Sequence, residues 1–94
     1  MSVNTDASER LDIPLPEGVE LNEVIGIVKK AYRHANQPGN ERTPHWRVLN
    51  TVRPHLERLG YEEGEVVGVF NGVSNYLVEI GEADRDRLNR IRLA

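Results

Sequence analysis

The residues best able to do chemistry are three histidines and two hydroxyls, and their spacing predicts neither a metal site nor a catalytic centre. His34, His45 and His55 stand ten or eleven positions apart, whereas zinc ligands on one helix face sit three or four apart. The chain has no Cys, which excludes thiolate ligands, disulfides and a Cys nucleophile. Thr51 and Ser74 have no motif that places a general base beside them. We therefore expect no enzyme activity, no metal and no cofactor.

The glycines do not supply a phosphate site either. Gly60, Gly64, Gly68 and Gly72 follow one another at intervals of four residues. This spacing does not fit GxGxxG, and no lysine stands where a phosphate-binding loop needs one. No small-molecule substrate is evident from the sequence.

The most distinctive side chains lie in the middle third of the chain. Residues 29–58 carry seven Lys and Arg against two acids, in a chain with a formal net charge of -3. Trp46 stands there beside an arginine, and this combination is enriched at the hot spots of protein interfaces. Two valines of the next predicted helix fall beside its apolar stripe, and with Trp46 they make a patch that would mark an interface. We predict that the protein binds another protein or a second copy of itself, as a homodimer, through His45, Trp46, Arg47, Val67 and Val78.

A second hypothesis makes the same basic segment a DNA-binding helix. Arg42, Arg47, Arg53 and Arg58 would then contact phosphates and base edges. The competing interpretation is that these arginines pair with acidic residues elsewhere in the chain. A helix-turn-helix also needs a tight turn, and the segment 37–42 before this helix is longer than one. DNA binding is therefore the alternative.

Two amphipathic helices are predicted to position these side chains, at about residues 17–36 and 43–59. In the first, acids gather at the start and cations at the end, as the helix dipole prefers. The second opens at Thr43-Pro44, an N-cap followed by proline at the first helical position, and stops at Gly60. Pro54 lies inside it, and we expect this proline to kink or split the helix.

Residues 62–80 could form either a helix or a hairpin. At about 100° per residue, most of the apolar side chains fall on one face, which predicts a helix. The β-branched residues and the pair Asn71-Gly72, which suits a type I′ turn, favour a hairpin over 65–80. Because that hairpin would be apolar on both faces, which two strands cannot bury, we predict the helix. The alternative is an α+β fold that resembles a winged helix, with the hairpin as its wing.

The two ends of the chain are predicted to add little to the core. Residues 1–16 are acidic and without period, and we expect a flexible arm whose segment Ile13-Pro14-Leu15-Pro16 forms a strap on the first helix. Residues 83–92 place acids before arginines, so we expect a short C-terminal helix docked by Leu88 and Ile91. The predicted fold class is all-α, a small bundle of three helices plus this fourth one.

Length and composition fit one domain, at residues 17–94 of the 94 in the sequence. No apolar run approaches the roughly 20 residues of a membrane span, and the start does not have the pattern of a secretory signal. We therefore expect no membrane association and a cytoplasmic location. In size and in its lack of catalytic motifs the chain resembles the small accessory proteins of phages. The sequence predicts a non-enzymatic accessory module.

Overall fold

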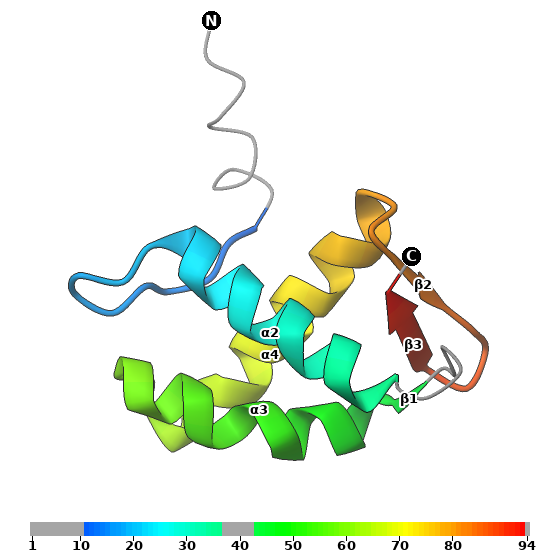
Figure 1. Ribbon diagram of the computed structural model, residues 1–94. Helices are drawn as coiled ribbons and strands as arrows, with labels where there is room; N and C mark the ends of the chain where they lie inside the picture. The colour runs from blue at the N-terminus through cyan, green and yellow to red at the C-terminus, as the bar shows by residue number, and fades with distance from the viewer. Residues whose placement is uncertain (1–10, 37–42, 94) are drawn as a thin grey trace, which may run out of the picture.

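Three helices and a small antiparallel sheet make up the fold. The computed structural model describes residues 11–36 and 43–93. A three-stranded sheet in the order β1-β3-β2 lies at one end of the three packed helices (Figure 1). The elements, in chain order, are α2 (Leu21–Ala35), β1 (Thr43–Pro44), α3 (His45–Leu59), α4 (Glu63–Glu79), β2 (Ala83–Arg85) and β3 (Arg90–Leu93).

The prediction of an all-α fold is wrong, because the C-terminal segment forms a hairpin. In place of a helix at 83–92, Ala83 pairs with Leu93 and Arg85 with Ile91. The segment RIRL alternates in polarity, which suits a strand. Its Ile91 is fully buried, whereas Leu88, the other expected docking residue, is 71% exposed at the turn. The acid-before-arginine order suits this hairpin as well as a helix, because the acids meet arginines across the two strands.

The helix predicted at 62–80 is present as α4, so the alternative hairpin over 65–80 is wrong. Asn71 and Gly72 lie inside the helix instead of forming a turn. The periodic signal prevails because one face of α4 enters the core, where a run of side chains at helical spacing is almost fully buried. These side chains are Val66, Val69, Phe70, Val73 and Leu77.

The first two predicted helices are also present, with shifted boundaries. α2 begins at Leu21 instead of residue 17, because Gly18 adopts a left-handed conformation (φ 80°) in a turn that the Val19 amide closes on the Pro16 carbonyl. Thr43-Pro44 forms β1, and α3 follows directly. α3 is one continuous helix through Pro54, so the predicted split is wrong. Gly60 ends α3 in the left-handed conformation, as predicted.

The strap before α2 packs on α4 and on the turn that precedes it. Leu11 is buried in the core, and the Tyr61 hydroxyl donates a hydrogen bond of 2.6 Å to the Pro14 carbonyl. A Cβ added at Gly72 would lie 2.9 Å from Cγ2 of Ile13. The segment expected on the first helix therefore contacts α4, and Leu15 points outward with 44% exposure. Residues 1–10 of the predicted arm lie outside the described residues.

The glycines of α4 provide a matched pair of substitutions. A Cβ at Gly68 would meet nothing within 4 Å, whereas one at Gly72 would press on Ile13. Gly68→Ala should stabilise the protein by about 0.5–1 kcal/mol, because alanine loses less entropy in a helix. Gly72→Ala should fail to show this gain, because the strap must move. Urea unfolding of both variants measures the difference, and equal gains would show that the strap does not pack as described.

A buried aromatic pair joins α2 to α4. The rings of Tyr32 and Phe70 stack with centroids 5.7 Å apart, and the Tyr32 hydroxyl shares a hydrogen bond of 2.7 Å with Ser74 Oγ. Burial raises the pKa of Tyr32 from 10.0 to about 12, against the smaller lowering effects of Ser74 and Arg85. The core therefore holds this phenol in its neutral form.

The raised pKa of Tyr32 predicts that the folded protein loses stability at alkaline pH. The unfolded chain releases the Tyr32 proton near pH 10 and the folded chain near pH 12, so stability falls as pH rises between these values. The loss attributable to Tyr32 is roughly 2–3 kcal/mol. Urea unfolding from pH 9 upward measures it, and Tyr32→Phe should flatten the slope. An equally steep slope in this variant would contradict the assignment to Tyr32.

The Asn36 side chain, at the C-terminal end of α2, forms hydrogen bonds with the sheet. Its Nδ2 donates to Thr43 Oγ1 at 2.9 Å and to the Ile91 carbonyl at 3.0 Å, and its Oδ1 accepts from the Leu93 amide at 3.1 Å. Thr43 Oγ1 in turn donates to the Ala35 carbonyl. Asn36 is 4% exposed, so these bonds lie in the interior. They fix the hairpin against the helices and thereby place the turn between β2 and β3.

Candidate functional site

Trp46 is the largest apolar side chain left at the surface. It lies in the first turn of α3 and is 60% exposed. The guanidinium carbon of Arg47 lies 5.7 Å from the centre of the indole ring, within the range of a cation–π contact. The tryptophan is thus presented to solvent together with a cation.

The turn of the hairpin brings a second apolar side chain to this corner. Pro44 of β1 pairs with Arg90 of β3, and the His45 amide donates to the Asn89 carbonyl at 3.3 Å. This bond brings the hairpin turn, which carries Leu88 next to Asn89, to the first residue of α3, and Leu88 is 71% exposed. Figure 1 shows the hairpin turn and the start of α3 at the same corner of the molecule.

Asp86 holds the hairpin turn in one shape. Its Oδ1 accepts from the amides of Leu88 (2.9 Å) and Arg90 (3.0 Å), and its Oδ2 accepts from Arg90 Nε (2.8 Å). These bonds, chiefly the one from the Arg90 backbone amide, lower the pKa of Asp86 below its usual 3.8. Asn89 completes the turn in the left-handed conformation (φ 60°). The Leu88 side chain therefore projects from an ordered turn.

His45 connects this corner to α4. Its ring packs against Phe70 with centroids 4.7 Å apart, and its Nε2 donates to Asn71 Oδ1 at 2.5 Å. His45 is half-buried, so much of its side chain faces the core. Its bond to Asn71 brings the edge of α4 that carries Val67, one turn earlier, close to the start of α3.

The two valines predicted for the patch differ in their surroundings. Val67 is 41% exposed. Val78 is half-buried and packs against the core. Of the four large apolar side chains that are exposed among the described residues, three belong to elements that the hydrogen bonds of His45 join, namely α3, α4 and the hairpin turn. These are Trp46, Val67 and Leu88, while Leu15 lies on the strap.

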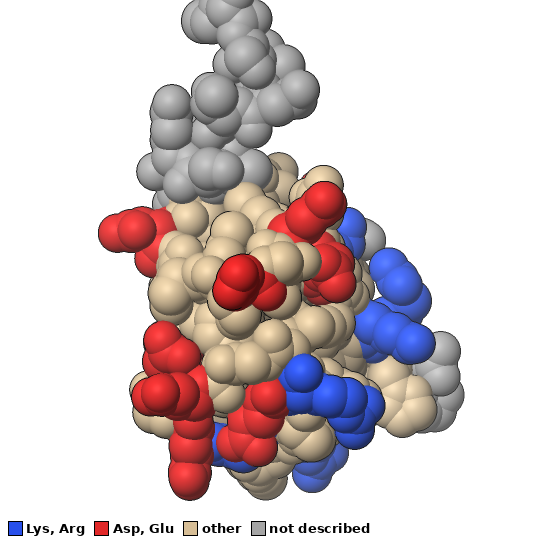
Figure 2. Space-filling model, turned by 90° about the vertical axis from the view of Figure 1, so that its left-hand side faces the viewer, with Lys and Arg blue, Asp and Glu red and all other residues tan. Residues whose placement is uncertain are grey.

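The charged side chains of this surface are acidic at the α4 end and basic at the hairpin turn. Glu63 lies one helical turn before Val67, and α4 with its N-cap carries four Glu and no Lys or Arg. At the other end, Arg87 adjoins Leu88 and makes no ion pair with any residue in 11–36 or 43–93. Figure 2 views the side of the molecule away from the hairpin turn, so Arg87 and Leu88 are not in view; on the side shown, acidic side chains predominate and basic ones gather toward the right. We call Glu63, Val67, Trp46, Arg87 and Leu88 the contact strip, with an acidic end, an apolar middle and a basic end.

The arginines of the DNA hypothesis do not converge on one face. Arg47 and Arg58 are eleven residues apart and so share a side of α3, whereas Arg53 lies about 120° away from that side. Arg53 is half-buried and Arg58 exposed. Arg42 lies outside the described residues.

The structure does contain a short helix–turn–helix connection, at Gly60–Glu62 between α3 and α4 and not at 37–42. In a DNA-binding unit of this kind the second helix enters the major groove. Here that helix is α4, which is acidic and without a cation, so phosphates would repel it.

The remaining histidines line one groove, which the sequence did not predict. His34 of α2 and His55 of α3 both line a cavity of about 370 Å³ between these helices. Their separation in sequence hid this shared groove, which depends on α2 and α3 packing side by side. The signal was the recurrence of Ile27, Ala31 and His34 on one side of α2 and of Thr51 and His55 on one side of α3. Among the described residues, no three His, Asp or Glu side chains gather closely enough to hold a metal ion.

No helix in 11–36 or 43–93 has the length and apolar character needed to cross a membrane. In comparisons with known proteins, no family model, no curated protein and no solved structure matches the chain.

Proposed function

We propose that the protein is a non-enzymatic, self-associating module whose copies meet through the contact strip. The observation that carries the proposal is that Trp46, Val67 and Leu88 are exposed on three separate elements that His45 joins through its bonds to Asn71 and Asn89. Exposed apolar side chains that cluster in this way favour an interface, and those scattered singly do not.

The charges on the strip favour a second copy as the partner. In a two-fold dimer each residue i that contacts residue j is matched by j contacting i. Such a dimer sets the acidic end of one strip, at Glu63, against the basic end of the other, at Arg87. Both pairs of ends attract, while Trp46 and Val67 are covered at the centre. The strip is thus complementary to itself.

Sedimentation velocity tests this proposal directly. Protein from about 1 μM to about 1 mM should pass from monomer to dimer, a range that spans the weak affinities of small interfaces. Because the centre of the strip is apolar, the dimer should persist in moderate salt, which screens only the charged ends. A strict monomer across this range would refute self-association.

The DNA alternative is tested on the same preparations. Binding of duplex DNA through arginines requires affinity to fall steeply as salt rises, with a log–log slope of several units. We expect affinity no tighter than about 10⁻⁴ M at physiological salt, the weak end of non-specific binding. Tighter binding that Arg47→Ala and Arg53→Ala weaken would favour the DNA alternative.

A further inference from the structure

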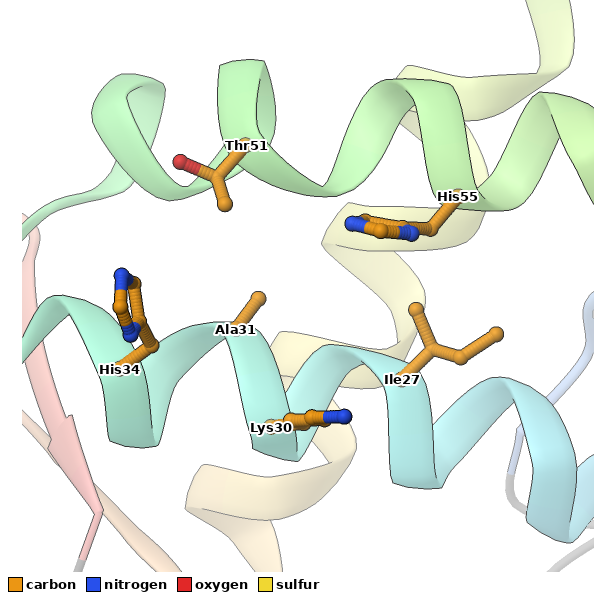
Figure 3. Close-up of a pocket in the computed structure, with 6 residues that line it drawn as sticks. All are labelled: Ile27, Lys30, Ala31, His34, Thr51 and His55. Carbon is orange, nitrogen blue, oxygen red and sulfur yellow. The ribbon is translucent and has the colours of Figure 1, made fainter.

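The groove between α2 and α3 has an apolar floor and a polar rim (Figure 3). Ile27 and Ala31 of α2 point up into it, and Ala31 is nearly buried. Thr51 and His55 of α3 enter from the opposite side, and His34 rises from α2 at the end near Thr51. Lys30 extends along α2 beside Ile27. The volume of about 370 Å³ lies within the usual range for ligand sites.

Three of the four polar side chains at this rim are donors without a partner in 11–36 or 43–93. Lys30, His34 and His55 make no hydrogen bond and no ion pair with any side chain or backbone group in the described parts of the chain. Thr51 differs, because its hydroxyl donates to the Arg47 carbonyl at 3.2 Å and keeps its lone pairs. Among the residues that the structure describes, no acid lines the groove. An ammonium group and two imidazoles, each able to donate to an anion, thus surround a hydrocarbon surface.

We infer that this groove binds a small organic anion, a carboxylate that carries a hydrocarbon chain. At the end of the groove near Ile27, where Lys30 and His55 lie (Figure 3), the carboxylate accepts hydrogen bonds from these two donors, and such charge-assisted bonds are the stronger kind. The hydrocarbon chain covers Ile27 and Ala31. His55 is nine residues from Trp46 and therefore on the opposite side of α3, so this site is separate from the contact strip and does not rest on the proposed function.

Octanoate is the probe, and amide chemical shifts of the full-length protein are the measurement. Titration should shift the amides of residues 27–34 and 51–55 saturably, with a dissociation constant of about 1 mM or tighter. 1-Octanol has the same chain without the charge, and acetate has the charge without the chain. Both should bind at least about tenfold more weakly, because octanol lacks the charged group that the rim donors bind and acetate lacks the chain that covers Ile27 and Ala31.

Substitutions at the exposed rim complete the test. Lys30→Gln and His55→Gln should each weaken octanoate binding roughly fivefold, the upper range for an exposed charge contact. Arg33→Gln removes the same charge from an exposed position of α2 outside the groove lining, and it should leave the affinity unchanged. Octanol binding as tightly as octanoate, acetate binding as tightly, shifts confined to other residues, or equal affinities in all three variants would each overturn the inference.

Discussion

Asn36→Ala should destabilise the protein by about 3 kcal/mol, a large share of the 5–15 kcal/mol expected for a small domain. The substitution leaves the Leu93 amide and the Ile91 carbonyl without the partner that Asn36 supplies, and each buried group without a partner costs about 1–3 kcal/mol. Thr43 also loses the bond that it accepts. The urea midpoint should fall by about 1–2 M.

Asn22→Ala is the matched control for this prediction. Asn22 is exposed on the same helix, so its loss should change stability by no more than about 0.5 kcal/mol. A loss below about 1 kcal/mol in Asn36→Ala would mean that water replaces the side chain and that Asn36 does not fasten the hairpin to α2.

Trp46→Ala should weaken dimerisation by about 30-fold or more. A tryptophan at the centre of an interface is a typical hot spot, and its truncation costs about 2 kcal/mol or more. Because the side chain is 60% exposed in the monomer, stability should change little. Sedimentation equilibrium measures the dimerisation constant, and thermal unfolding verifies the fold.

Leu15→Ala is the control for this second prediction. Leu15 is also an exposed apolar residue, at 44%, but it lies on the strap outside the contact strip. Its replacement should leave the dimerisation constant within about twofold of the original value, a difference well under 1 kcal/mol. Equal weakening by the two substitutions would indicate non-specific association through any exposed apolar side chain.

The helices could be predicted from the sequence because each buries a long stripe of apolar residues. In α4 this stripe outweighed Asn71-Gly72 and the three interior glycines. Gly72 is explained by the strap, which approaches so closely that a Cβ would press on Ile13. That approach joins residues about sixty positions apart, so no local pattern could reveal it.

The hairpin could not be predicted from charge order, because Asp84 and Asp86 favour both structures. As strands, they meet Arg92 at 3.6 Å and Arg90 at 2.7 Å. The decisive partner is distant, since β1 pairs with β3 and Asn36 binds its backbone. The alternation in RIRL was the local signal.

Because residues 83–92 were predicted to form a helix, the part of the candidate site that the hairpin turn carries could not be predicted. Trp46 was identified from its type and its basic neighbours, and the structure does leave it exposed. Leu88 was expected to dock a helix, and it instead stands at the turn of the hairpin. The groove was missed for a similar reason, because His34 and His55 line the same groove only when α2 packs against α3.

A mixing experiment with two charge-reversed variants tests the contact strip most directly. Arg87→Glu makes both ends of the strip acidic, and Glu63→Arg makes both ends basic, so each variant alone should sediment as a monomer at concentrations where the original protein is a dimer. Mixed in equal amounts, the two should form a heterodimer, because each acidic end then meets a basic one. Variants that still dimerise alone, or a mixture that remains monomeric, would contradict association through the contact strip.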